Sequence, residues 1–327
     1  MGSKAIPMRS SAAVMFLLAA AIGITTLIAT AAKTHAAEQI RSPAPRYVAK
    51  DLGWSLKVPQ EEIVAFQGTA NFDGAGMGAA QMLYLAPNIA GFFAGLITHG
   101  ILLDATRNSQ KRKILDAADK VLAPYQPVLS SYKYRDLMQR ALEKTTTAGV
   151  KRLVEPSEKP GADLLIESVP VFSMTQDQTA IVLDNAIAIY VPGAASATAY
   201  KNIIRVVSPS AVKPDLVSFW LAKEGDALKA ESARLLAESL DLALSEIAES
   251  TERDRPHRTV RYIEGTTERM ERGQIVKELC DRIVLMNLRG WLMSVPVKPG
   301  STVTTSCGDS APQAPKIEAV EPPQHTD

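Results

Sequence analysis

The sequence predicts an α+β fold in which a helical N-terminal region precedes a small, mostly antiparallel sheet packed against one or two helices. Three observations predict it. Apolar residues recur at helical spacing between residues 114 and 146. Apolar residues then alternate in 180–191, as in a half-buried strand. Finally, the long segment 226–250 carries one apolar stripe opposite charged residues. The 327 residues suffice for one large or two ordinary domains.

Residues 1–37 are interpreted as a signal peptide or an N-terminal membrane anchor. Lys4 and Arg9 form a basic start, and an uncharged apolar run follows from residue 12 to residue 32. Small residues at the end of this region favour cleavage after residue 36 or 37. The run of roughly twenty residues is also long enough for an uncleaved anchor, so both remain open. In either case we expect the following residues to leave the cytoplasm.

An extended connector is expected over 38–60, where prolines occur without a sustained period. A helical region then follows over 61–158. It includes a Gly-rich apolar segment, 74–103, which contains no charged side chain. Gly91 and Gly95 in this segment lie four residues apart and would let a second helix approach closely.

Two interpretations of residues 79–103 remain open. A second membrane span would place the basic residues that follow on the cytoplasmic side, as the positive-inside tendency requires. Pro87 interrupts the segment, however, and leaves an apolar length below the roughly twenty residues that a span needs. We therefore favour a broken hairpin packed on the protein itself or on a partner.

A sandwich of strands and helices is predicted for residues 159–300, and a disordered tail for 301–327. The period of the apolar residues distinguishes the two kinds of element. Strands are expected at 163–172, 180–191, 202–207, 259–265 and 290–297, and helices at 226–250 and 273–288.

The sequence shows no motif of strong catalytic, cofactor-binding or metal-binding specificity. It lacks a phosphate-binding loop, a paired-histidine zinc motif and a nucleophile elbow. His99 is the one histidine suited to buried acid–base chemistry, although a structural role is the more common one for such a residue. Trp291, beside Arg289 and Gly290, either belongs to the core at the start of a strand, which is the more common case, or marks an edge that could contact a partner. We therefore predict no catalytic residue, cofactor or metal, and regard Gly91, Gly95, His99 and Trp291 as candidate packing or interaction residues.

The only two cysteines, Cys280 and Cys307, lack the spacing of a metal site. In an oxidising compartment they would form a disulfide that joins the tail to the body of the protein. In the cytoplasm the same thiols would stay reduced. Their redox state would therefore report the compartment.

These features predict a non-enzymatic protein of the bacterial cell envelope, periplasmic or anchored in the inner membrane. It would bind an envelope protein or a membrane surface, and its association into a homo-oligomer also remains possible. The formal charge of +1 and the aromatic content of 6% argue against nucleic-acid binding. Two alternatives are an exported hydrolase that uses His99 and a two-span inner-membrane protein with a cytoplasmic α+β domain.

Overall fold

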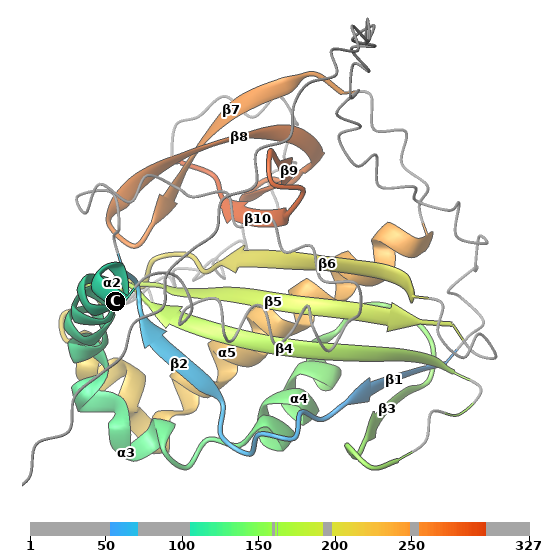
Figure 1. Ribbon diagram of the computed structural model, residues 1–327, viewed down its shortest axis with the longest axis horizontal. Helices are drawn as coiled ribbons and strands as arrows, with labels where there is room; N and C mark the ends of the chain where they lie inside the picture. Colours follow the sequence, from blue (N-terminus) through green and yellow to red (C-terminus); the bar gives the residue numbers. More distant parts are fainter. Residues whose placement is uncertain are drawn as a thin grey trace, which may run out of the picture. The chain divides into compact units, whose positions relative to one another are not determined.

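The computed structural model describes residues 53–70, 105–158, 161, 163–191, 198–248 and 255–298. Ten strands in these ranges form one mixed sheet with the order β3-β1-β4-β5-β6-β10-β9-β8-β7, and β2 pairs separately with β4 (Figure 1). The predicted fold class is therefore wrong. The sheet is large and mixed rather than small and mostly antiparallel, because it takes strands from both halves of the chain.

Three antiparallel strands form the centre of the sheet: β4 (Leu164–Met174), β5 (Ile181–Tyr190) and β6 (Thr198–Val207). The predicted strands over these segments are confirmed. Alternation along β5 places Leu183 and Ile187 in the main hydrophobic core, whereas Val182 belongs to a second core. Both faces of the central sheet are therefore covered.

Three short strands extend one side of the sheet by parallel pairing: β1 (Trp54–Lys57), β2 (Ala65–Gly68) and β3 (Lys151–Val154). β1 and β2 pair with successive parts of β4, and β3 pairs with β1. The segment predicted as a connector thus contributes β1, and the region predicted as helical contributes β2 and β3. Four residues are too few for a reliable period, so the sequence pattern did not reveal these strands.

The other side of the sheet is an antiparallel meander of β7 (His257–Glu264), β8 (Thr267–Glu278), β9 (Arg282–Asn287) and β10 (Leu292–Pro296). β10 joins it to β6 by parallel pairing. A bridge between Tyr262 and Val297 brings β7 back toward the end of β10. The meander therefore curls around the second core.

The helix predicted over 273–288 is wrong, because this segment forms the end of β8 and all of β9. Ile283 and Leu285 lie in the second core, whereas Val284 and Met286 lie in the main core. A strand buried on both faces is continuously apolar. Its apolar residues therefore also satisfy a helical period.

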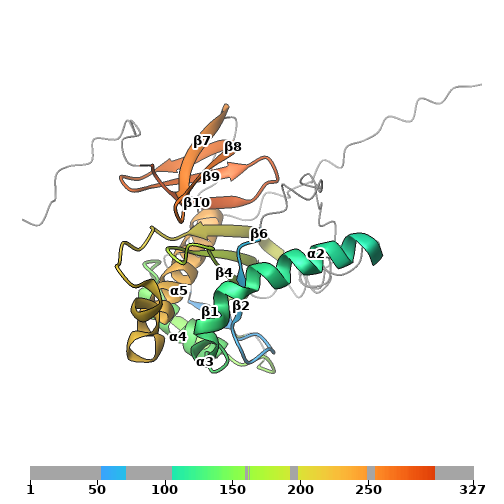
Figure 2. The ribbon, with the colours of Figure 1, turned by 90° about the vertical axis from the view of Figure 1, so that its left-hand side faces the viewer.

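The helices of the described ranges are α2 (Ala105–Ala118), the 3₁₀ helix η2 (Asp119–Tyr125), α3 (Gln126–Leu129), α4 (Tyr134–Lys144) and α5 (Leu216–Ala248). The helices predicted within 114–146 and 226–250 are confirmed. α4 and α5 lie side by side against one face of the central strands (Figures 1 and 2). α5 is kinked at residues 222–225, where Gly225 has a φ of +78°.

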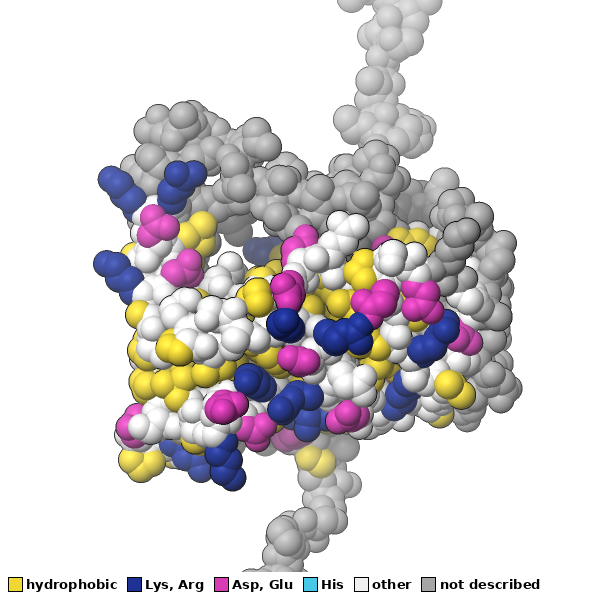
Figure 3. Space-filling model, turned by 90° about the horizontal axis from the view of Figure 1, so that it is seen from below, with side chains coloured by type: hydrophobic (Ala, Val, Ile, Leu, Met, Phe, Trp, Pro, Cys, Tyr) yellow, Lys and Arg dark blue, Asp and Glu magenta, His cyan; other side chains and the backbone are white. Residues whose placement is uncertain are grey.

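The face shown in Figure 3 carries Lys and Arg side chains interspersed with Asp and Glu, and apolar surface lies between them. Ion pairs such as Arg140–Asp226 and Lys133–Glu62 join neighbouring helices and loops at the surface. Among the helices of the described ranges, none has the length and hydropathy needed to cross a membrane.

Candidate functional site

The turn between β9 and β10, Asn287–Trp291, is held in one conformation by Asn287. The side-chain oxygen of Asn287 accepts hydrogen bonds from the backbone amides of Arg289 and Trp291, both at 3.0 Å. The backbone of Asn287 also bonds to Gly290 and to Trp291, at 2.9 Å each. Gly290 adopts a φ of +78°, which glycine tolerates at little cost. We call these five residues the recognition turn.

The recognition turn presents an apolar and a cationic side chain to solvent. Leu288 is 64% exposed, and Arg289 is also exposed. Trp291 is half-buried. The guanidinium carbons of Arg205 and Arg289 lie 5.9 and 5.5 Å from the centroid of the Trp291 ring, within the range of cation–π contacts. Trp291 thus lies directly before β10, with two guanidinium groups within cation–π range of its ring.

The support for Trp291 comes from a paired arginine on the central strands. Nε and Nη2 of Arg205 on β6 donate to the two carboxylate oxygens of Asp184 on β5, at 2.7 and 2.6 Å. The Asp184 carboxylate raises the pKa of Arg205 above its ordinary value. This two-point contact orients the guanidinium that faces Trp291.

A cavity of about 310 Å³ lies where the β4–β5 turn meets the β7–β8 turn. Polar side chains line it, including Thr69, Asp177, Glu264, Thr266 and Arg269. Glu264 is buried, with 8% of its surface exposed. Its carboxylate lies 3.5 Å from Nε of Arg269 in an ion pair. The cavity therefore combines hydroxyl groups with one carboxylate–guanidinium pair.

Asp177 holds the two turns beside the cavity together. Oδ1 accepts hydrogen bonds from the Thr175 hydroxyl and from the amide and hydroxyl of Thr179, and Oδ2 accepts from the amide and hydroxyl of Thr266. Partial burial opposes ionisation, but these hydrogen bonds outweigh it and hold the pKa of Asp177 far below its ordinary value. A permanently ionised and fully hydrogen-bonded carboxylate is unsuited to general-base chemistry.

Gly265 lets the β7–β8 turn approach Asp177. Its φ is +66°, and a Cβ at this position would lie 2.6 Å from Oδ2 of Asp177. The backbone oxygen of Gly265 accepts a hydrogen bond from the Ser210 hydroxyl at 2.5 Å. Both the conformation and the space at this turn therefore require glycine.

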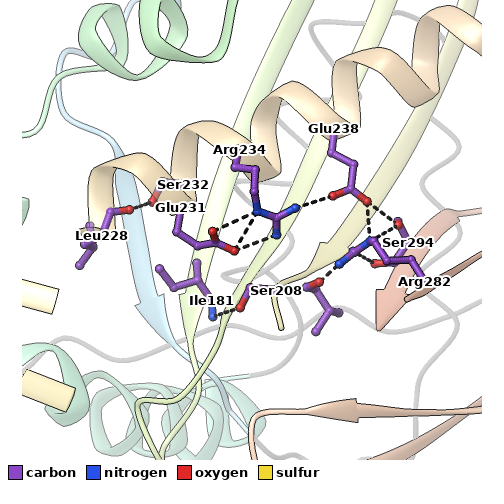
Figure 4. Close-up of polar contacts among 10 residues, drawn as sticks. Ile181, Ser208, Leu228, Glu231, Ser232, Arg234, Glu238, Arg282 and Ser294 are labelled. Atoms are coloured by element: carbon purple, nitrogen blue, oxygen red, sulfur yellow. Dashed lines mark hydrogen bonds and ion pairs between the residues drawn. The ribbon is translucent and has the colours of Figure 1, made fainter. Parts of the chain in front are cut away.

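A polar network joins α5 to the meander (Figure 4). Arg234 lies between Glu231 and Glu238 on α5, and Arg282 of β9 approaches Glu238 at 2.8 Å. Arg282 is 6% exposed and also donates to Val207 O and to both oxygens of Ser294. Burial lowers the pKa of Arg282 below its ordinary value. The Ser294 hydroxyl donates to Glu238 in this network, but Ser294 is fully buried and out of reach of a substrate, so we interpret the network as structural.

Most of the candidate residues from the sequence lie outside the described ranges: Gly91, Gly95, His99 and Cys307. Cys280 lies in the turn between β8 and β9, and no cysteine of the described part of the chain is free. The Cys280–Cys307 disulfide stays a prediction. Within the described ranges no three His, Cys, Asp or Glu side chains are grouped so as to hold a metal ion.

Sequence reasoning missed Asp177, Glu264 and Arg269. It assigned the segment around Asp177 only to a hairpin turn, and Glu264 and Arg269 only to a strand and the residues after it. A signal was present in the Thr-x-Asp-x-Thr pattern of residues 175–179, since flanking hydroxyls often bond to a turn aspartate.

Comparison of the chain with protein-family models, with curated proteins and with solved structures finds no match.

Proposed function

We propose that this chain is a non-enzymatic protein of the bacterial cell envelope that acts by binding a protein partner through the recognition turn. The observation that carries the proposal is the exposed Leu288 in the same turn as Arg289 and Trp291, whose ring has two guanidinium groups within cation–π range. Trp and Arg are enriched among the residues that dominate protein interfaces. A turn already fixed by Asn287 loses little conformational entropy when it binds.

The proposed location is supported by the sequence that precedes the described residues. A basic start followed by an uncharged apolar run is typical of an export signal or an inner-membrane anchor. A Cys280–Cys307 disulfide would be compatible with an oxidising compartment. We therefore place the sheet in the periplasm, with the mature chain either released or anchored.

The interaction can be tested by site-specific photo-crosslinking in cells of the source organism. A photoreactive amino acid replaces Leu288 in one strain and Val212 in another. Val212 is a suitable control because it is 91% exposed and lies outside the turn. We expect one discrete protein adduct from position 288 and none from position 212. An equal adduct pattern from both positions would contradict the proposal.

Two further measurements separate the proposal from its rivals. Trp291→Ala should abolish the adduct from position 288 while the thermal unfolding of the chain changes little. Flotation of the purified chain with anionic phospholipid vesicles should give no binding that depends on Leu288, and such binding would favour a membrane surface instead. An adduct between two copies of the chain would show that the partner is a second copy and that the turn forms a homo-oligomer.

Location needs its own experiment. Fractionation with sequencing of the mature N-terminus should place the chain in the periplasm or inner membrane. Thiol labelling before and after permeabilisation of the inner membrane adds the orientation. Free thiols reached only after permeabilisation would show a cytoplasmic domain and contradict the proposed location.

A further inference from the structure

The cavity between the β4–β5 and β7–β8 turns has unused hydrogen-bonding capacity. Asp177 does not supply it, because a carboxylate offers about four lone-pair sites and Asp177 already accepts five hydrogen bonds. Likewise, the amide nitrogen of Gln176 already donates to Thr69 O and Ala118 O, at 3.0 and 3.1 Å. These residues build the walls of the cavity.

The unused capacity belongs to Glu264, Arg269 and Thr69. Glu264 is more than nine-tenths buried, yet its contact with Arg269, at 3.5 Å, is at the upper limit for a hydrogen bond. The hydroxyl of Thr69 is buried and has no hydrogen-bond partner among the described residues. A buried polar group without a full set of partners costs free energy, and a ligand that supplies the partners recovers it.

The charges of the cavity select the chemistry of that ligand. The cavity holds two carboxylates, Asp177 and Glu264, and one guanidinium, Arg269. An anion would face both carboxylates, and a simple cation would face the guanidinium. The Asp177 oxygens already accept five hydrogen bonds, so the groups open to a ligand are Glu264 and Arg269. A compound that carries both charges a few bonds apart can match the pair, because its ammonium meets Glu264 while its carboxylate meets Arg269. The remaining walls offer threonine hydroxyls and the Gln176 amide group, with apolar surface between them.

The size of the cavity restricts the ligand further. A volume of about 310 Å³ is at the lower end of the roughly 300–1,000 Å³ typical of small-molecule sites. From charge, lining and size together, we propose that this cavity binds a small zwitterion, a free α-amino acid with a short polar or absent side chain. Its ammonium group bonds to Glu264 and its carboxylate to Arg269.

The test uses the full-length purified chain and isothermal titration with glycine and L-serine. Saturable binding of both is expected at concentrations up to about 10 mM. N-acetylglycine, which lacks the ammonium group, and glycine methyl ester, which lacks the carboxylate, should each bind about tenfold more weakly, the effect of losing one hydrogen bond to a charged group. Glycerol tests for a general polyol site and should not bind.

Two variants assign the binding to this cavity. Glu264→Gln should weaken glycine binding about tenfold, because the amide carries no charge. The matched control is Glu268→Gln on the same hairpin, where the carboxylate pairs with the exposed Arg261 outside the cavity. It should leave the affinity within about twofold.

Thr69→Val provides a second variant in case Glu264→Gln does not fold. It removes a hydroxyl that has no partner among the described residues, so the chain should fold normally while glycine binding weakens. The proposal is overturned by an absence of saturable binding of glycine and L-serine. It is also overturned if N-acetylglycine or glycerol binds as tightly as glycine, or if well-folded Glu264→Gln and Thr69→Val variants bind like the unmodified chain.

Discussion

Replacing Glu238 with alanine tests the polar network between α5 and the meander. The carboxylate of Glu238 forms an ion pair with Arg282, whose Nε lies 2.8 Å from Oε1, and it accepts hydrogen bonds from Nη1 of Arg234 at 3.0 Å and from the Ser294 hydroxyl. Arg282 is 6% exposed, so its charge remains buried when Glu238 is removed. The substitution therefore leaves a buried guanidinium without its carboxylate partner.

The expected loss of stability follows from this burial. Removing one member of a buried ion pair costs about 3–5 kcal/mol. Here Arg282 keeps hydrogen bonds to Val207 O and Ser294 O, and the Glu238 side chain is 21% exposed. Both features reduce the penalty, so we expect about 3 kcal/mol for Glu238→Ala.

Glu231→Ala is the matched control. Glu231 lies on the same helix and pairs with Arg234, whose side chain is 37% exposed, so its removal should cost less than about 1 kcal/mol. Both substitutions exchange Glu for Ala on a helix, so the helix propensity changes equally. Joint replacement of Glu238 and Arg282 by methionine should recover most of the loss, because no buried charge then remains.

Urea denaturation followed by far-ultraviolet circular dichroism measures these differences in the free energy of unfolding. The variants should unfold with similar slopes and different midpoints. The reasoning is refuted if Glu238→Ala costs no more than Glu231→Ala, or if the double methionine variant is less stable than Glu238→Ala.

Three further predictions concern the turns. Because the pKa of Asp177 is lowered in the folded state, its ionised carboxylate stabilises the fold at pH values above the unfolded-state pKa of about 3.9. This stabilisation is lost as pH falls toward the folded-state pKa. In urea titrations, the free energy of unfolding of the unmodified chain should therefore exceed that of Asp177→Asn by a constant amount above about pH 5 and by a shrinking amount in acid. Gly265→Ala should lower the free energy of unfolding by at least about 1 kcal/mol more than Gly290→Ala, since both have positive φ but only Gly265 adjoins Asp177; equal losses would contradict the predicted clash. Asn287→Ala should lower the free energy of unfolding by about 1–2 kcal/mol, measured by thermal or urea unfolding, because two backbone amides of the turn lose their acceptor. An unchanged unfolding midpoint would show that the recognition turn does not depend on this side chain.

Local pattern predicted the elements whose two faces carry side chains of different size or polarity. Alternation in residues 180–191 predicted β5, and the single stripe in 226–250 predicted most of α5. Such patterns are determined by the chain itself, because the period of the apolar residues must match the period of the backbone.

Long-range pairing decided the rest. The segment 273–288 satisfies a helical period, but partners on β7, β10 and the main core make it two strands. β1 is too short to be detected without β4 beside it. The cavity is lined by segments far apart in the chain, where Asp177 and Thr266, 89 residues apart, are joined by hydrogen bonds. The sequence by itself thus determined the strongly amphipathic elements, and it predicts export. The tertiary structure decided the extent of the sheet and the candidate sites, because these depend on contacts between segments distant in the chain.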